Sequence, residues 1–354
     1  MIKLFSPYVP NEAIKEVSDI LHSQWIAQGP KVNLFEEEFS KLFKVKYPVS
    51  LNSGTSALEI AYDLIGLKEG DEVITTPFTC SATNIPLLHR GVKVVWADIL
   101  EDTLCIDPID VRSKLTEKTK AVVQVHLGGV KADAGIVHVP IVSDACQALG
   151  IFTGDYTCCS FQAIKHITTG DGGMLMLSNE LEYRKAKLMR WFGIDRERVI
   201  PNEWESYRTR MMSFDIELIG EKKQMNDLAA TLGIVGLSHY GEVVTYRKRL
   251  FDLYKRLLKG VDGLKIIDGK ENVYWLFTVL VERRDDFAKM LFEAGIETNL
   301  VQVRNDKYKI FGGKKVELPV LDSIENKYIS LPIGMHVEEE DVRYIVGQIR
   351  KGWG

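Results

Sequence analysis

Apolar residues near the N-terminus recur with a helical period. Between residues 11 and 22 they stand at Ala13, Ile14, Val17, Ile20 and Leu21. This spacing is typical of an amphipathic helix. The sequence WIAQGP at residues 25–30 ends the pattern, because glycine and proline break helices. A second helix is predicted over residues 31–44.

Short apolar runs rich in β-branched residues alternate with helical stretches from residue 51 onward. The runs cover residues 73–76, 92–97, 121–126, 139–143, 158–161 and 174–177. A continuous apolar run of this length is typical of a strand that is buried on both faces, as in a parallel sheet. Residues 56–66 have a helical pattern. The alternation predicts an α/β sheet covered by helices on both faces.

The pattern changes after about residue 225. Helical spacing dominates residues 226–259, followed by a strand-like run at 273–281 and helices at 285–294 and 338–350. A single hydrophobic core stops growing near roughly 250–300 residues, and this chain has 354. We therefore expect a large domain with an N-terminal arm over residues 1–238 and a smaller α+β domain over 239–354. The helix near residues 240–259 would connect them.

Charge and cysteine usage exclude several classes of protein. The chain carries 45 Lys and Arg against 49 Asp and Glu, and no basic stripe predicts a nucleic-acid groove. No apolar stretch approaches the roughly 20 residues that cross a bilayer, and no signal-peptide pattern stands at the N-terminus, so we expect a soluble, cytoplasmic protein. The five cysteines form no CxxC pair and are expected to be reduced thiols without a metal. Neighbouring Cys158 and Cys159 should point to opposite faces of a strand.

The sequence NSGTSA at residues 52–57 forms a small-residue turn between a probable strand and a helix. A helix N-terminus presents unpaired N–H groups and suits a phosphate. Helix capping alone is the alternative, with Ser56 and Glu59 as a capping box or with Ser53 and Ser56 as partners. The stretch PFTCSATN at 77–84 is predicted as another loop at the same edge of the sheet.

Two ionisable residues follow predicted strands. Asp144 stands at the carboxyl end of a strand, where open α/β sheets bind ligands. A buried carboxylate needs a partner, and a protonated pyridine nitrogen would be one. The alternative is an Asp that caps the next helix. Lys165 stands in SFQAIKHITTGDGG at 160–173, where its amine could lose its hydration and become reactive. The alternative is a solvated surface lysine.

In this order, the segments resemble the DegT/StrS-type sugar aminotransferases, a branch of the fold-type I pyridoxal-phosphate enzymes. The resemblance runs from WIAQGP through NSGTSALEIA, GDEVITTPFTCSATN, residues 144–147 and SFQAIKHITTGDGG to QMNDLAATLG and LPIGMHVEEEDV. It covers nearly the whole chain. It implies a fold-type I large domain with a mostly parallel central sheet, a smaller α+β C-terminal domain, and pyridoxal 5'-phosphate as the cofactor.

By this resemblance, Lys165 forms the Schiff base with the cofactor, Asp144 contacts its pyridine nitrogen, and Gln147 lies near its phenolic oxygen. The phosphate would be bound around Gly54 by Thr55, Ser56 and Ser160, and Cys80 would contact the ring where many members place an aromatic residue. Related dehydratases carry His at the position of Lys165, so transamination is favoured. The stretch between Gln147 and Ser160 is shorter than in the family.

Lys222 stands where the family has an Asn that reaches the phosphate from the neighbouring subunit. The replacement keeps a hydrogen-bond donor and adds a positive charge. The resemblance therefore implies a homodimer with shared active sites. The alternative for Lys222 and Lys223 is a solvated, charged turn.

The expected reaction is the amination of a nucleotide-linked keto-6-deoxy sugar, at C4 or alternatively at C3, with glutamate as the donor. Trp25 and Arg304 are candidate substrate contacts, and Arg304 could bind a carboxylate or diphosphate or form a surface salt bridge. The competing hypotheses are a cysteine desulfurase or amino-acid decarboxylase of the same fold type and a non-catalytic sugar-nucleotide sensor. The order of the motifs disfavours the first, and the intact Lys165 and Asp144 disfavour the second.

Overall fold

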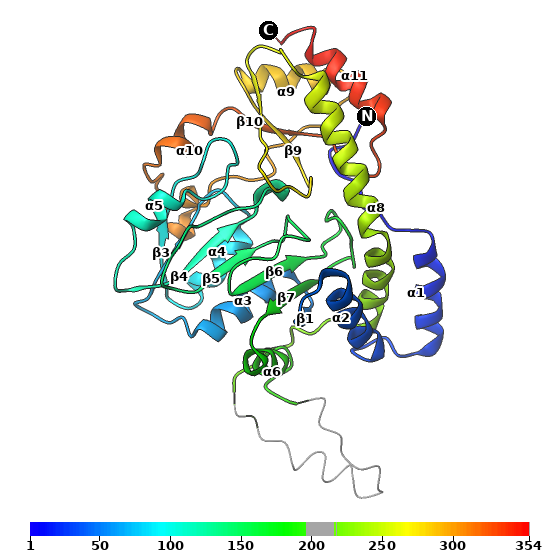
Figure 1. Cartoon of the computed structure of the whole chain (residues 1–354), viewed down its shortest axis with the longest axis vertical. Coiled ribbons are helices and arrows are strands. Elements are labelled where there is room, and N and C mark those ends of the chain that lie inside the picture. Colours follow the sequence, from blue (N-terminus) through cyan, green and yellow to red (C-terminus); the bar gives the residue numbers. More distant parts are fainter. Residues whose placement is uncertain (196–215, 217, 354) are drawn as a thin grey trace, which may run out of the picture.

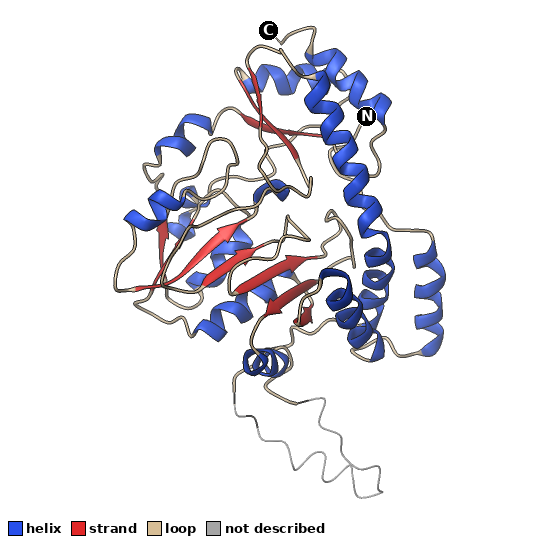
Figure 2. Cartoon of the chain, in the orientation of Figure 1, coloured by secondary structure: helices blue, strands red, loops and turns tan. Residues whose placement is uncertain are grey.

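A seven-stranded sheet forms the centre of the large domain (Figures 1 and 2). The computed structural model describes residues 1–195, 216 and 218–353. The strands are β1 (Tyr47–Leu51), β2 (Glu72–Thr75), β3 (Lys93–Trp96), β4 (Thr119–Val125), β5 (Ile141–Asp144), β6 (Tyr156–Ser160) and β7 (Gly173–Leu177), in the spatial order β1-β7-β6-β5-β4-β2-β3. β7 runs antiparallel to both of its neighbours, β1 and β6, and the other neighbouring strands of this sheet are parallel. The predicted mostly parallel sheet is confirmed.

Helices cover both faces of this sheet. On one face, α3 (Gly54–Ile65) and α6 (Glu180–Met189) share a core with the sheet residues Cys158, Leu175 and Leu177. On the other face, α2 (Pro30–Phe43) and the first half of α8 (Asp227–Leu257) pack on Cys159, Met174 and Met176. The two adjacent cysteines thus point to opposite faces, as predicted from the alternation of side chains along a strand. All five cysteines are free thiols.

One predicted loop contains a helix. Residues 77–80 form the loop that follows β2, and α4 (Ser81–Leu88) begins directly after it. The helix is short and contains Pro86, so it shows no helical period in the sequence. It buries Thr83 and Asn84 beneath the site described below. The other large-domain helices are α1 (Glu12–Ser23) and α5 (Pro108–Ser113).

A three-stranded antiparallel sheet forms the small domain, with β8 (Leu264–Ile266), β9 (Phe277–Val281) and β10 (Tyr328–Leu331) in the order β10-β9-β8. It packs with α9 (Arg284–Glu293), α11 (Glu339–Ile349) and the second half of α8. The division predicted at residue 238 falls inside α8, which contributes to both cores.

Two segments pack against parts of the chain that are far from them in sequence. Near the N-terminus, the backbone N–H of Ile2 donates to the carbonyl of Gly295, 2.8 Å away, in the small domain. Conversely, α10 (Pro319–Ile324) contributes Leu321 to a core that contains Phe78 and Trp96 of the large domain. The C-terminal half of the chain therefore reaches the carboxyl edge of the large sheet.

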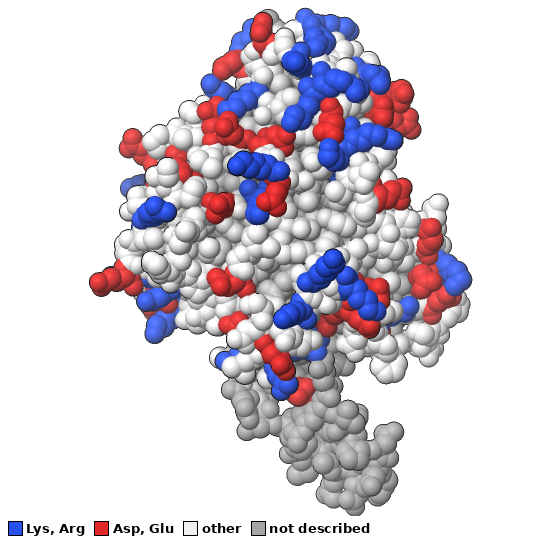
Figure 3. All heavy atoms as spheres, in the orientation of Figure 1, with Lys and Arg blue, Asp and Glu red and all other residues white. Residues whose placement is uncertain are grey.

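On the face shown in Figure 3, acidic and basic side chains are interspersed over the described residues, without a continuous basic stripe. Among the helices of the described residues, none combines the length and the apolar character needed to cross a membrane.

Candidate active site

A pocket of about 400 Å³ lies where the strands β5 and β6 end. Its walls come from some of the residues in the large-domain segments 53–58, 80–82, 144–147 and 160–172 and from Trp275, Val301 and Gln302. A larger pocket of about 500 Å³ lies beside α6. None of the predicted site residues lines that larger pocket, so the chemistry rather than the volume identifies the site.

Asp144 is a buried carboxylate on the pocket wall, with 5% of its surface exposed. Its Oδ2 accepts a hydrogen bond from the Thr83 hydroxyl at 2.7 Å, and its Oδ1 accepts one from the backbone N–H of Cys146 at 3.0 Å. No helix follows directly, because the next element is β6, so Asp144 is not a helix cap. The two donors fix the carboxylate and leave it able to accept a further bond from a ligand in the pocket.

Lys165 lies on the same pocket, in the loop between β6 and β7. Its Nζ is 4.0 Å from the centre of the Trp275 ring, and no carboxylate of the described residues lies within ion-pair distance. Burial lowers the pKa of the Lys165 amine, and the nearby Cys146 and Asp144 oppose this effect in part. A lowered pKa gives more of the neutral amine at a given pH, which is the form that acts as nucleophile or base.

The segment that holds Trp275 is attached to the lysine loop at two points. The Trp275 indole N–H donates to the carbonyl of Ile164 at 3.0 Å, and His166 donates through Nε2 to the carbonyl of Val273 at 2.7 Å. Burial lowers the pKa of His166 to about 3, so the ring is neutral. Lys165 therefore stands between two residues that are hydrogen-bonded to this segment.

Sequence reasoning missed Trp275. The run at 273–281 predicts a strand, but β9 begins only at Phe277. The four residues before β9 instead form a segment outside the strand, whose Trp275 lines the pocket. This segment is held by the backbone N–H groups of Val273 and Leu276, which donate to the carbonyls of Gly129 and Gly128, both at 2.9 Å. Trp275 follows Ile164 by 111 residues, and nothing in the local pattern indicates that they meet.

The N-terminus of α3 forms another part of the pocket wall. Ser53 caps the helix, since its hydroxyl accepts from the backbone N–H of Ser56 at 3.0 Å. The capping box of Ser56 with Glu59, considered as an alternative, is not formed, because Ser53 is the N-cap and Glu59 pairs with Lys223 at 2.9 Å. Ser53, Gly54 and Thr55 line the pocket. The hydroxyl of Ser56 donates to Asn52 at 2.7 Å, and Ser56 does not line the pocket.

Gly54 allows a close approach between this helix and the sheet. A Cβ atom at position 54 would lie 2.7 Å from the Cys146 sulfur and 3.0 Å from the Cβ of Ser160. Any larger residue would therefore push the helix N-terminus away from Asp144 and Ser160. The first N–H groups of a helix have no acceptor within the helix and can bind an anion.

Three further predicted residues of the large domain meet at this pocket. Ser160, Cys80 and Gln147 all line it. Cys80 is exposed at the start of α4. Gln147 is buried, and its side-chain carbonyl accepts from the backbone N–H of Gly128 at 2.9 Å.

Besides Ser56, three predicted residues do not line the pocket of this chain. Trp25 is 58% exposed and lies against Gly29. Lys222 is exposed, and its carbonyl accepts from the Asn52 side chain at 3.3 Å, next to the start of α3. Arg304 is fully buried, 1% exposed.

The structure corrects the predicted substrate contact at Arg304. Its Nε and one terminal nitrogen donate to the two oxygens of Asp306, at 2.8 and 2.7 Å, and the other terminal nitrogen donates to Asp322 at 2.5 Å. All three guanidinium nitrogens are thus occupied by carboxylates of the same chain. Arg304 is neither a ligand contact nor the exposed salt bridge considered as the alternative.

The pocket residues fit pyridoxal 5'-phosphate. The helix N-terminus at Gly54 and Thr55 suits the phosphate, the Asp144 carboxylate suits a protonated ring nitrogen, and the Lys165 amine suits the aldehyde. Pocket volumes of roughly 300–1,000 Å³ are usual for ligands and cofactors, and this pocket lies within that range.

Comparison with known proteins identifies a family. A family model described as the DegT/DnrJ/EryC1/StrS aminotransferase family matches residues 7–350. The chain is 27% identical to the dTDP-4-dehydro-2,3,6-trideoxy-D-glucose 4-aminotransferase of Saccharopolyspora spinosa, covering 99% of this chain and 96% of that protein.

Solved structures show the same similarity. AtS13 from Actinomadura melliaura superposes with a TM-score of 0.92 at 32% identity, covering 100% of this chain and 99% of the other. The sugar aminotransferase CalS13 from Micromonospora echinospora gives a TM-score of 0.91 at 28% identity over the full length of both chains.

Proposed function

Because the chain belongs to the DegT/DnrJ/EryC1/StrS aminotransferase family, we propose that it transfers the amino group of glutamate to C4 of a nucleotide-linked 4-keto-6-deoxy sugar. The enzyme class, a pyridoxal-phosphate-dependent sugar aminotransferase, follows from the family. The C4 position is supported by the name of the Saccharopolyspora relative. Amination at C3 is the alternative.

One observation carries the proposal. The Lys165 amine, whose pKa burial lowers, the fixed carboxylate of Asp144 and the N-terminus of α3 all line a single pocket. These are the groups needed to hold pyridoxal 5'-phosphate and to move protons beside it. When bound, the cofactor supplies an electron sink for the negative charge that develops on the reacting carbon.

The residues of the chain have separate tasks in this reaction. Asp144, held by Thr83, keeps a proton on the ring nitrogen of the cofactor by its negative charge. Lys165 accepts a proton at Nζ from one carbon and returns it to another, as a general base and then a general acid. The N–H groups at Gly54 and Thr55 hold the phosphate, so that the ring keeps its orientation.

The charge of the pocket supports a second subunit at the site. Lys165 is the only Lys or Arg among the described residues of the pocket wall, which also carries Asp144 and Asp171. Glutamate brings two carboxylates and the cofactor brings a phosphate. We propose that a homodimer supplies the missing positive charge and that Lys222 of the neighbouring chain is its source.

The test of the proposed function is a donor and acceptor screen. The enzyme is incubated with ¹⁵N-glutamate and a panel of nucleotide-linked 4-keto and 3-keto sugars. We expect a ¹⁵N-amino sugar and an equal amount of 2-oxoglutarate, with a 4-keto acceptor giving the highest kcat/KM. Lys165→Ala should form neither product, whereas Lys15→Ala, which removes an exposed lysine paired with Asp19, should behave as wild type. Turnover of amino acids without any reaction on keto sugars would contradict the proposal.

A further inference from the structure

Gln302 is a polar residue on the pocket wall that the chain leaves without a side-chain partner. It lines the pocket and is 8% exposed. Within the described part of the chain, its side-chain amide makes no hydrogen bond, although its backbone does. Buried polar groups are nearly always hydrogen-bonded. The amide faces the pocket and is therefore available to hydrogen-bond a ligand there.

We propose that Gln302 determines substrate specificity by hydrogen-bonding a hydroxyl group of the sugar ring, an inference that rests on the proposed function. The amide is neutral and offers both a donor and an acceptor, as a hydroxyl group does. A carboxylate or diphosphate is instead usually matched by a cation. The one guanidinium nearby in sequence, that of Arg304, is occupied by Asp306 and Asp322.

The backbone of Gln302 is held in a restricted conformation. The Tyr328 hydroxyl donates to the carbonyl of Gln302. The preceding residue, Val301, has a φ of 38°, a left-handed conformation that β-branched residues rarely adopt. Such conformations persist only where the surrounding structure imposes them, and they are common at ligand sites. The backbone of Gln302, from which its side chain reaches the pocket, is therefore set by the fold before a substrate binds.

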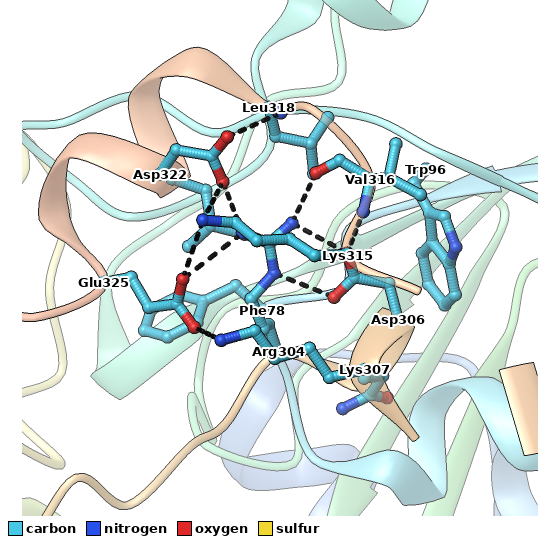
Figure 4. A network of polar contacts seen from close by, with 12 residues as sticks. Phe78, Trp96, Arg304, Asp306, Lys307, Lys315, Val316, Leu318, Asp322 and Glu325 are labelled. Carbon is cyan, nitrogen blue, oxygen red and sulfur yellow. Dashed lines mark hydrogen bonds and ion pairs between the residues drawn. The ribbon is translucent and has the colours of Figure 1, made fainter. Parts of the chain in front are cut away.

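The ionic cluster in Figure 4 anchors the chain just after Gln302. Arg304 lies at its centre, with Asp306 and Asp322 on two sides, and Lys315 also pairs with Asp322 at 2.9 Å. Because these groups are held to one another, residues 303–306 cannot shift without breaking charged hydrogen bonds. The cluster thus positions Gln302 without touching the pocket.

Asn305 ties the same segment to the large domain. Its side-chain N–H donates to the carbonyl of Thr79 at 2.8 Å, and its side-chain oxygen accepts from Asn84 at 2.9 Å. Thr79 precedes Cys80 of the pocket wall, and Asn84 follows Thr83, the residue that holds Asp144. Gln302 is therefore fixed relative to the groups expected to bind the cofactor.

The experiment compares two acceptors that differ only in ring hydroxyls. They are the 4-keto-6-deoxy sugar that the wild type uses in the screen above and its 2,3-dideoxy analogue on the same nucleotide. Gln302→Met should lower kcat/KM for the hydroxylated sugar by about tenfold, the usual effect of losing one neutral hydrogen bond. It should change kcat/KM for the dideoxy analogue by less than about twofold. Gln348→Met makes the same chemical change on α11, outside the pocket. It should leave the ratio of kcat/KM for the hydroxylated sugar to kcat/KM for the dideoxy analogue unchanged.

The half-reaction with glutamate provides a second readout. The absorbance change of the bound cofactor on adding glutamate alone should proceed at the wild-type rate in Gln302→Met. Equal losses with both sugars, a slower half-reaction with glutamate, or no change at all would each overturn the role of Gln302. Failure of the wild type to aminate any keto sugar would instead remove the proposed function, and this is read from the wild type alone.

Discussion

The amine of Lys165 lies 4.0 Å from the centre of the Trp275 ring, so a residue from the C-terminal part of the chain covers this lysine of the large domain. An ammonium group over an indole face is attracted by the ring quadrupole. The indole also excludes water from one side of the amine, and burial lowers the pKa of Lys165. Trp275 therefore holds the side chain in place, while burial makes the Lys165 ammonium lose its proton more readily than a free lysine does.

Replacing Trp275 should slow the capture of the cofactor by Lys165. Trp275→Leu removes both the ring face and the bond to Ile164, and we expect a decrease in the capture rate of about tenfold, from the roughly 0.5–2 kcal/mol of such contacts. Trp275→Phe keeps a ring and should have an intermediate rate. The rate is followed as the visible absorbance that grows when cofactor-free enzyme is mixed with pyridoxal 5'-phosphate.

Trp353→Phe is the matched control for this prediction. Its indole N–H also donates to a backbone carbonyl, that of Glu282, at 2.7 Å, but Trp353 lies in the small-domain core. The control should capture the cofactor as fast as wild type. Equal rates for Trp275→Leu and wild type would show that the ring does not position the amine.

The pH dependence of cofactor capture should report the lowered pKa of Lys165. Only the neutral amine reacts, so the rate should rise with pH and level off above a midpoint. Because burial disfavours the charged form, this midpoint should lie below roughly 10.4, the value of an unperturbed lysine. N-α-acetyl-lysine provides the reference under the same conditions.

Asp144→Asn should lower the midpoint pH of cofactor capture further. The Asp144 carboxylate stabilises the ammonium form and so raises the pKa of Lys165 against the effect of burial. Its removal takes away that stabilisation. A midpoint at the value of the free amine, or an upward shift in Asp144→Asn, would contradict this description of the site.

In the ionic cluster around Arg304, the buried ion pairs should contribute more to the free energy of unfolding than the partly exposed ion pairs do. Arg304→Ala leaves Asp306, which is fully buried, without its partner. Breaking a buried pair in this way destabilises a protein by roughly 3–5 kcal/mol. Lys307→Ala removes a partly exposed partner of Glu325 and should lower the free energy of unfolding by at most about 1 kcal/mol. Urea unfolding followed by circular dichroism measures both, and similar losses in the two variants would count against a structural role for Arg304.

Subunit exchange tests whether Lys222 completes the site of a neighbouring chain. Lys165→Ala and Lys222→Ala are mixed and allowed to exchange, and activity is assayed at a limiting concentration of pyridoxal 5'-phosphate. If Lys222 acts across the interface, one site of the mixed dimer carries both changes and the other carries neither. Activity should then rise above that of either parent. Verified exchange without recovery, or a fully active monomer in light scattering, would refute the shared site.

The sequence predicts the large domain well because its signals are local. Each predicted strand from residue 73 to 177 overlaps an observed strand, since a buried strand must be apolar along its length. Asp144, Ser160 and the turn at Gly54 all adjoin strand ends, and the strands of one sheet bring them to a common edge. Their meeting in one pocket could therefore be predicted without knowledge of the tertiary structure.

The C-terminal wall of the pocket could not be predicted in this way. Trp275 and Gln302 reach the site through the docking of the small domain, which leaves no periodic pattern in the sequence. The short strands β8 and β10 could not be predicted because neither LKI nor YISL contains two consecutive β-branched residues. Arg304 was misjudged because a stretch of mixed charges looks the same whether it is buried or exposed. Only the packing of α10 shows that Asp322 lies against Arg304.

The most direct test of the account is to identify the lysine that binds the cofactor. The enzyme is incubated with pyridoxal 5'-phosphate, reduced with borohydride and digested, and the phosphopyridoxyl adduct is located by mass spectrometry. The account predicts one adduct per chain, on Lys165, and none in Lys165→Ala under the same conditions. A stoichiometric adduct on another lysine, or equal labelling of the Lys165→Ala variant, would contradict it.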